Sequence, residues 1–130
     1  MPPRYVADTH AFLWYLIDSP KLSKKARAIF DLSTQGQAII IIPAIVLLES
    51  IDVVDKKKVD LEFEKILFKL TQASNFVISE IDLGLILEVN KTKGFKDLHD
   101  RVIVATARVF DAPLISRDKF IQKIYHDVIW

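Results

Sequence analysis

The sequence predicts an α/β fold in which helices cover both faces of a parallel sheet. Short apolar runs rich in β-branched residues alternate with segments whose apolar residues recur at helical spacing, as is typical of parallel strands joined by helical crossovers. Residues 38–42 include four consecutive isoleucines without polar alternation, as expected of a strand buried on both faces. The chain has 130 residues, which is enough for one core and too few for two ordinary domains.

Strands and helices are expected in the following order. The strands are expected at residues 5–7, 38–42, 76–78, 113–115 and 128–130. The helices, with their capping residues, are expected at residues 9–17, 23–32, 44–54, 61–73, 82–90 and 97–110. Thr9 and Ser23 are suitable N-caps for the first two helices, Gly36 ends the second, and Pro43 suits the first position of the third. Because strands keep alternating with helices, a parallel sheet is the most economical architecture.

Composition excludes several classes of protein. The 18 Lys and Arg residues against 17 Asp and Glu give a net charge of +1, so the chain lacks the broad basic excess that by itself indicates a nucleic-acid binder. It contains no cysteine, which excludes disulfides, thiolate zinc sites and cysteine nucleophiles. The longest apolar stretch, residues 38–48, is interrupted by Pro43 and is shorter than the ~18 residues of a membrane span. The start of the chain also lacks the apolar core of a secretion signal, so we expect a soluble cytoplasmic protein without membrane association.

Four acidic residues are expected to meet at one edge of the sheet. Asp8 directly follows the first strand, and Asp118 follows the fourth strand after two residues. Asp100 lies in the first turn of a helix that enters from the same side, and Glu49 lies on the helix that leaves the second strand. In parallel sheets, ligands bind beyond the carboxyl ends of the strands, near the point where strand order reverses. We therefore expect the four carboxylates to converge if the first and fourth strands are neighbours.

Such a cluster of carboxylates indicates a bound cation. Like charges within a few ångströms disfavour joint ionisation, and a metal ion resolves this conflict. Oxygen ligands without cysteine favour Mg²⁺ or Mn²⁺ over Zn²⁺. One or two such ions can activate water and stabilise the leaving oxygen of a phosphodiester. The chemistry implied by the residues is hydrolysis of a nucleic-acid backbone.

Four motifs occur in the chain in the order YVADTHAFLWYL, IPAIVLLES, DLHDRVIVATA and PLISRD. In this order and spacing they resemble the PIN domain family, and specifically its VapC-type toxin ribonucleases. The resemblance covers nearly the whole chain and implies a three-layer α/β/α PIN-like fold with about five parallel strands, formed by a single nuclease domain over residues 1–130. It also implies Mg²⁺- or Mn²⁺-dependent RNA cleavage by the toxin of a toxin-antitoxin pair, inhibited by its cognate antitoxin.

The resemblance assigns a role to each of the four acids. Asp8 matches the first acid of the family and Glu49 the acid on the helix after the second strand. Asp100 matches the acid of the DxxIxATA stretch, and Asp118 matches the acid after the last inner strand. These four residues are expected to bind metal and to act in catalysis. Relatives often have a hydroxyl residue shortly before the helix acid, whereas residues 45–48 are all apolar here.

Five further residues are expected to assist these acids. Asp97 resembles an extra acid found in many relatives, and it is expected to act through water or through Arg101. Thr9 and Ser116 are expected to donate hydrogen bonds to the acids. Arg101 and Arg117 are candidates for contacts with RNA phosphates, whose loss flattens the salt dependence of binding.

Each acid also has a simpler explanation. Asp8, Asp97 and Asp118 could merely cap helices, and Asp100 could be an acid favoured by the dipole of a first helical turn. Glu49 could lie on the solvent-exposed side of an amphipathic helix. The alternative function is therefore a non-catalytic PIN-like module that binds protein or RNA, and a structure-specific DNA nuclease ranks third.

Apolar residues outside the expected core suggest a partner. Leu61 and Phe68 project roughly opposite to the apolar stripe of the helix expected at residues 61–73. We expect an antitoxin segment, or a second copy of the chain in a homodimer, to cover them. Trp14 is expected at the margin of the core, although an exposed aromatic side chain could stack on an unpaired RNA base.

Overall fold

A five-stranded, all-parallel sheet forms the centre of the molecule in the computed structural model, which describes residues 1–130. The strands are β1 (Arg4–Ala7), β2 (Ile39–Pro43), β3 (Phe76–Ser79), β4 (Leu114–Ile115) and β5 (Val128–Ile129). Their spatial order is β3-β2-β1-β4-β5. Strands β2 and β3 therefore lie on one side of β1, and β4 and β5 lie on the other. The strand order reverses between β1 and β4.

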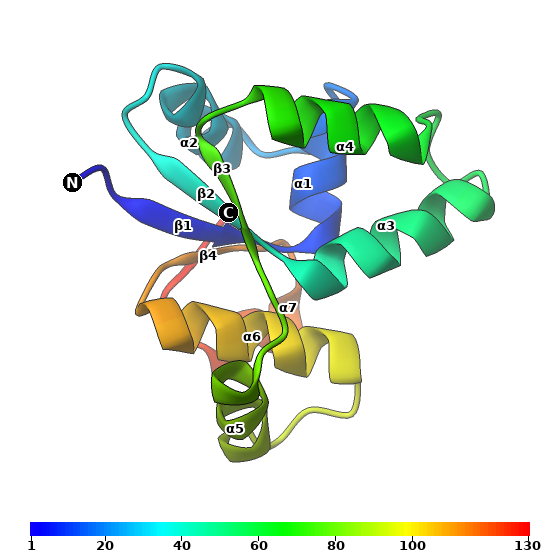
Figure 1. Ribbon diagram of the computed structural model, residues 1–130. Helices are drawn as coiled ribbons and strands as arrows, with labels where there is room; N and C mark the ends of the chain where they lie inside the picture. Colours follow the sequence, from blue (N-terminus) through cyan, green and yellow to red (C-terminus); the bar gives the residue numbers. More distant parts are fainter.

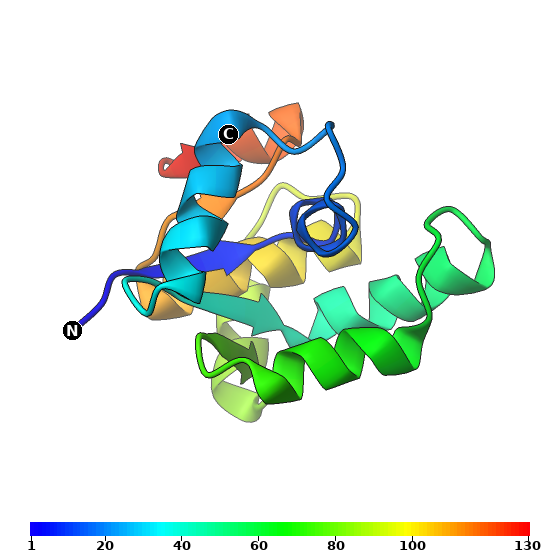
Figure 2. The ribbon, with the colours of Figure 1, turned by 90° about the horizontal axis from the view of Figure 1, so that it is seen from above.

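Seven helices cover the two faces of this sheet. They are α1 (Thr9–Leu16), α2 (Lys24–Thr34), α3 (Ala44–Asp55), α4 (Phe63–Gln72), α5 (Leu83–Lys91), α6 (Leu98–Phe110) and α7 (Lys119–Ile124). Figure 1 shows α1, α2 and α4 above the sheet and α5, α6 and α7 below it, and Figure 2 shows α2 and α4 on the near side of the strands with α6 beyond them. The predicted three-layer α/β/α architecture is confirmed. None of these helices is both long enough and apolar enough to cross a lipid bilayer.

One apolar cluster of 27 buried residues holds the layers together. The isoleucine run of β2 supplies Ile40, Ile41 and Ile42, each at most 1% exposed, because neighbouring strands flank it and helices cover both its faces. Residues 102–107 of α6 are all buried, since α6 packs against β1 and β2 and carries α5 on its outer side. A core of this continuity holds the carboxyl ends of the strands in fixed positions.

Three helix starts differ from the sequence prediction, and the first two are those of α1 and α7. The N-cap of α1 is Asp8, not Thr9: the Ala11 N–H donates to Asp8 Oδ1 at 2.9 Å, and Thr9 is the first helical residue. Asp8 takes this role because its backbone is still extended where the helix begins. The short helix α7 lies after Asp118. The sequence suggested it only through the capping role considered for Asp118, because its six residues are too few to show a helical period.

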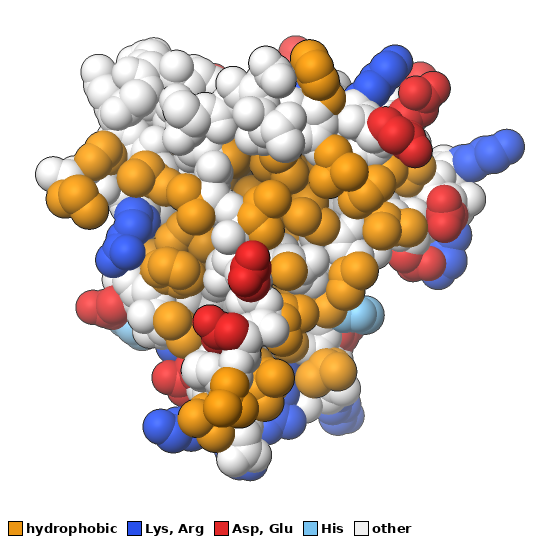
Figure 3. All heavy atoms as spheres, viewed as in Figure 1, with side chains coloured by type: hydrophobic (Ala, Val, Ile, Leu, Met, Phe, Trp, Pro, Cys, Tyr) orange, Lys and Arg blue, Asp and Glu red, His pale blue; other side chains and the backbone are white.

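The prediction for Leu61 is wrong, whereas Phe68 projects outward as expected. Helix α4 begins only at Phe63, so Leu61 lies in the preceding segment and packs, partly buried, against the core. Phe68 is 64% exposed. A wider apolar surface covers the face that contains the edge strand β3 (Figure 3). Its exposed members on α3, α4, β3 and α5 include Leu48, Ile51, Leu67, Val77, Ile78, Leu83, Ile86 and Leu87.

Candidate active site

The strand order brings Asp8 and Asp118 to the same edge of the sheet. Strands β1 and β4 are neighbours, with Ala7 opposite Ile115, and the Asp8 N–H extends this pairing by donating to the Ile115 carbonyl at 3.2 Å. Both acids thus follow adjacent strands at the position where strand order reverses, which is where parallel sheets place their ligands. Asp118 also caps α7, accepting a hydrogen bond from the Ile121 N–H at 3.0 Å.

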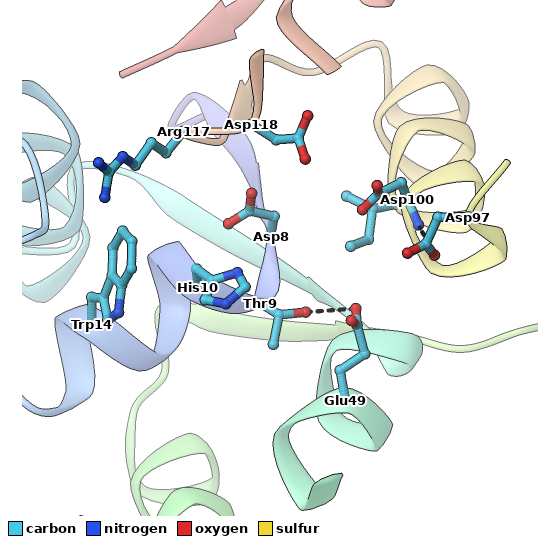
Figure 4. A pocket seen from close by; sticks show the side chains of 10 residues that line it. Asp8, Thr9, His10, Trp14, Glu49, Asp97, Asp100, Arg117 and Asp118 are labelled. Carbon is cyan, nitrogen blue, oxygen red and sulfur yellow. Dashed lines mark hydrogen bonds between the residues drawn. The ribbon is translucent and has the colours of Figure 1, made fainter. Parts of the chain in front are cut away.

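Two further acids reach the same place from helices. Glu49 comes from α3, which leaves β2, and Asp100 comes from the first turn of α6. A cavity of about 430 Å³ brings all four expected acids together, and Figure 4 shows them pointing toward its centre. Its lining residues are Asp8, Thr9, His10, Trp14, Glu49, Asp97, Asp100, Ile103, Arg117 and Asp118.

Hydroxyl groups hold three of these acids in place. The Thr9 hydroxyl donates to Glu49 Oε1 at 2.7 Å, which joins the start of α1 to α3. The Ser116 side chain is fully buried; its oxygen accepts the Asp118 N–H at 3.0 Å, and its hydroxyl forms a hydrogen bond with Asp8. One serine therefore links the two acids that follow β1 and β4.

Burial is the main influence on Asp8. The residue is only 7% exposed, and this burial raises the pKa of its carboxyl to about 6. Hydrogen bonds from Ser116 and from the Ala11 N–H and the nearness of His10 lower this pKa, and the charge of Asp118 raises it, but burial dominates. The metal-free site therefore opposes the charge of Asp8 in neutral solution.

Burial and the surrounding acids act together on Asp100. Burial raises its pKa to about 6, and Asp97, Asp118, Glu49 and Asp8 add to the increase in that order. Every one of the other acids lining the cavity thus contributes repulsion at this carboxyl. A divalent cation would reverse the sign of the local field and favour the charged forms.

Few cations offset this acidity. Arg117 is the only lysine or arginine among the lining residues. The imidazole of His99 lies outside the lining, with Nδ1 at 3.5 Å from Asp97 Oδ1 and at 3.8 Å from Glu49 Oε2. The acids are therefore not neutralised by intruding lysines.

The donor set fits a hard divalent cation that keeps part of its water shell. All four acids offer carboxylate oxygens, the ligand type that Mg²⁺ and Mn²⁺ prefer. In the structure the side chains do not close into a group of three or more that could hold an ion by themselves. Mg²⁺ usually binds through one or two carboxylates and retains several waters, so this open arrangement suits Mg²⁺ better than an ion that requires a complete protein shell.

Three of the five expected auxiliary residues line the cavity, and two do not. Thr9 and Arg117 line the cavity, as does Asp97, which caps α6 by accepting from the His99 N–H at 2.7 Å. Ser116 is fully buried and does not line the cavity. Arg101 is absent from the lining.

Arg101 instead binds the end of α5. Its Nε donates to the Val89 carbonyl at 2.8 Å and its Nη2 donates to the Asn90 carbonyl at 3.3 Å. The expectation that Arg101 contacts substrate therefore does not agree with its geometry, because backbone carbonyls at the end of the neighbouring helix hold its guanidinium. This position depends on the packing of α5 against α6, which the local sequence does not reveal.

Sequence reasoning did not assign three lining residues, His10, Trp14 and Ile103, to the acidic site, although it considered base stacking for Trp14. Trp14 and His10 lie one turn apart on α1 with ring centroids 5.5 Å apart. Their spacing from Asp8 could have revealed them, because side chains on the first turns of a helix remain near the acid at which the helix starts. Ile103 faces the cavity from α6, one turn after Asp100, and is 1% exposed.

The N-cap explanation and the active-site explanation hold for the same side chains. Asp8, Asp97 and Asp118 each cap a helix, and each also lines the cavity. A capping carboxylate uses one oxygen for the backbone N–H, which leaves its other oxygen available to a cation.

Comparisons with solved structures show related folds. A chain of VapBC2 from Rickettsia felis, solved with a DNA fragment of its promoter, matches with a TM-score of 0.70 at 18% identity and covers 98% of this chain and 97% of its own. A chain of a toxin-antitoxin complex from Klebsiella pneumoniae matches with a TM-score of 0.61 at 22% identity, covering 97% and 96%. A chain of FitAB bound to the IR36 DNA fragment matches with a TM-score of 0.60 at 15% identity, covering 96% and 93%. At these identities the likeness concerns the fold.

A family model adds evidence at the level of sequence. A search of curated proteins gives no match. The model described as the PIN domain matches residues 5–127, a span that includes β2, β3 and β4, all but the first residue of β1, and all four converging acids. The chain therefore belongs to the PIN domain family.

Proposed function

We propose that this protein is a Mg²⁺- or Mn²⁺-dependent endoribonuclease, the toxin of a VapBC-type toxin-antitoxin pair. The observation that carries the proposal is the meeting of four carboxylates from four different elements around one cavity without a lysine among its lining residues. Membership of the PIN family supports nuclease chemistry, and the fold likeness to chains of toxin-antitoxin complexes supports the toxin class. Residues 1–130 would form a single nuclease domain that acts on cytoplasmic RNA.

The residues of the site have separable tasks in this proposal. Asp8 and Asp118 would hold the principal ion, and Asp100 and Glu49 would complete its surroundings or orient the attacking water. The bound ion would supply an activated water and positive charge at the leaving oxygen. The hydrogen bond from Thr9 holds the Glu49 carboxylate at 2.7 Å. Ser116 keeps Asp8 aligned with Asp118.

The proposal predicts a specific product and a specific metal dependence. In-line attack by water on the phosphodiester leaves a 5′-phosphate on the downstream fragment. Purified protein freed of its inhibitor is expected to cut single-stranded RNA with millimolar Mg²⁺ or Mn²⁺ and not with EDTA. Asp8→Asn is expected to abolish cleavage and growth inhibition in cells. Asp82→Asn is the control, since Asp82 also caps a helix through its Oδ1 but lies outside the cavity.

Two results would contradict this proposal. The first is an absence of cleavage with either metal, together with growth inhibition that is unchanged by Asp8→Asn. The second is a thermal midpoint that does not change across millimolar Mg²⁺ and Mn²⁺, because an ion that prefers the native state must raise its stability. The second result would favour the non-catalytic binding module instead.

We also propose that the antitoxin covers Phe68. This side chain lines a cavity of about 570 Å³ between α1, α2 and α4, together with Leu16 and Phe76. An exposed aromatic ring at the edge of a cavity is a common anchor position in protein interfaces. Phe68→Glu is expected to lower the affinity for the antitoxin at least tenfold while the thermal midpoint is retained. Unchanged affinity would contradict the proposal that the antitoxin covers Phe68.

A homodimer is proposed on the face that contains β3. This strand is an edge of the sheet, and edge strands present unpaired backbone groups that proteins usually cover. Beside it, Leu83 is 70% exposed and Leu87 is 56% exposed. Leu87→Glu is expected to produce monomers in light scattering and to leave antitoxin affinity intact. Phe68→Glu should instead lower antitoxin affinity and leave the dimer intact. If both variants have the same effect, the two surfaces have been assigned wrongly.

A further inference from the structure

A group of aromatic and basic side chains borders the acidic cavity on one side. Figure 4 shows Arg117 and Trp14 on one side of the cavity, with Asp97, Asp100 and Glu49 on the other. The Arg117 guanidinium carbon lies 5.7 Å from the centre of the Trp14 ring, and Lys21 Nζ lies 5.8 Å from it. We call Trp14, Lys21 and Arg117 the Trp14 platform.

The Trp14 platform joins two cavities. A second cavity of about 700 Å³ shares His10, Trp14 and Glu49 with the acidic one, and Lys21 and Lys58 line it. A ligand that lies across Trp14 can therefore occupy both spaces at once. One end of such a ligand would reach the acids and the other would meet lysines.

The basic side chains of the Trp14 platform are free to bind an anion. Lys21 and Arg117 are exposed, and neither forms an ion pair with a carboxylate of the protein. Arg27, by contrast, pairs with Asp18 at 2.6 Å. Lys21 and Arg117 therefore add positive charge on the side of the cavity opposite most of its acids.

Trp14 provides a ring held at a fixed distance from the acids. It is partly buried and packs on the core, with the Trp130 ring centroid 5.9 Å away. Asp8 caps α1 and Trp14 is six residues later, a rise of about 9 Å along the helix. The ring therefore stands beside the acidic site, close enough to contact a nucleotide adjacent to a bound phosphate.

We propose that the Trp14 platform is a subsite for an unpaired nucleotide next to the cleaved phosphodiester. The base stacks on the Trp14 ring, while Arg117 and Lys21, whose long side chains can leave the ring, bind flanking phosphates. Every base has a π-face, and stacking is therefore tolerant of sequence. A paired base cannot present its face in this way. The subsite thus selects single-stranded RNA without selecting a sequence. The inference rests on the proposed ribonuclease function.

The first test uses tryptophan fluorescence. The chain contains two tryptophans, so Trp130→Phe leaves Trp14 as the only reporter. Asp8→Asn is added to prevent cleavage in the presence of Mg²⁺. A short single-stranded oligoribonucleotide is expected to quench the Trp14 emission, and the same strand without bases should bind more weakly and quench little. Equal quenching by both strands, or quenching by an acidic peptide but not by RNA, would overturn the proposal.

The second test separates stacking from charge. Trp14→Leu is expected to weaken RNA binding roughly 5- to 150-fold, the range for loss of one stacked base, whereas Trp14→Phe should retain most of the affinity. Phe68→Leu is the control for an exposed aromatic on another surface. Arg117→Ala and Lys21→Ala should each reduce the salt-dependence slope by about 0.7, and Lys65→Ala should not. Unchanged binding in Trp14→Leu, at an unchanged thermal midpoint, would remove the subsite.

These outcomes separate the subsite from the ribonuclease proposal. If RNA binds through Trp14 but wild-type protein cuts nothing with Mg²⁺ or Mn²⁺, Trp14 still binds an unpaired nucleotide and the enzymatic proposal fails. If wild-type protein cuts RNA and Trp14→Leu retains its kcat/KM for unpaired substrate, the enzymatic proposal stands and the subsite fails.

Discussion

Replacement of Asp8 by asparagine is expected to stabilise the metal-free protein. Burial raises the Asp8 pKa from 3.8 to about 6, so between these values the folded chain binds more protons than the unfolded chain. The free energy of unfolding therefore falls as pH rises through this range. Above about pH 6 the full cost of burying the charged Asp8 carboxylate is present. A shift of about two units corresponds to roughly 3 kcal/mol. Asparagine carries no charge to desolvate and caps helices as well as aspartate does.

The expected gain is about 2 kcal/mol near neutral pH, since asparagine offers Ser116 one acceptor oxygen instead of two. For a chain of this size, that gain raises the thermal midpoint by about 6–8 °C. The assay is calorimetric unfolding in EDTA at neutral pH and again at about pH 4, where the Asp8 carboxyl of the folded protein is protonated and the difference should nearly vanish. Millimolar Mn²⁺ should then stabilise wild type more than Asp8→Asn, because a ligand stabilises the state that binds it.

The control for this experiment is Asp82→Asn. Asp82 caps α5 with the same geometry, accepting from the Leu85 N–H at 2.8 Å, but its side chain is exposed. This variant should change the thermal midpoint by less than about 2 °C, as exposed positions usually do. If both variants shift the midpoint equally, or if Asp8→Asn lowers it in neutral EDTA, the reasoning from burial is refuted.

Three further outcomes follow from the site. Thr9→Val removes the hydrogen bond to Glu49 and should lower kcat by about tenfold with little change in KM, since such a bond to a charged group contributes about 1.5–3 kcal/mol; an unchanged kcat contradicts this role. Asp97→Ala removes the cap of α6 and should lower the thermal midpoint by about 3 °C, whereas Asp97→Asn should preserve it. Because the pKa values of Asp8 and Asp100 are raised to about 6, the Mn²⁺-induced rise in the midpoint should shrink as pH falls below that value, and a rise that is constant from neutral to acid conditions would contradict it.

The sequence was most informative where one local pattern determines the structure. The isoleucines of β2 are buried on both faces, as their lack of polar alternation predicts. Ser23 caps α2 as predicted, with the Ala26 N–H donating to its hydroxyl oxygen at 3.1 Å. The positions of Asp8 and Asp118 after their strands predicted that the two acids share a sheet edge if those strands are neighbours. Strands β1 and β4 are indeed paired.

What the sequence could not reveal depends on packing between distant elements. Arg101 is directed by the carbonyls at the end of α5, whose position beside α6 is a tertiary property. Leu61 is partly buried against the core because α4 begins two residues later than its apolar pattern suggests. The separation of the four carboxylates is set by the angles of α3 and α6 against the sheet, and a motif contains no information about these angles.

The three acids that begin helices around the cavity, Asp8, Asp97 and Asp118, have a genetic consequence. Exchange of one carboxylate oxygen for an amide nitrogen leaves each helix start intact, so loss of reactivity does not require loss of structure. Under the proposed toxin function, a single codon change turns the active nuclease into a well-folded, inactive copy. Such a copy would still bind the antitoxin and would thereby release active copies made in the same cell.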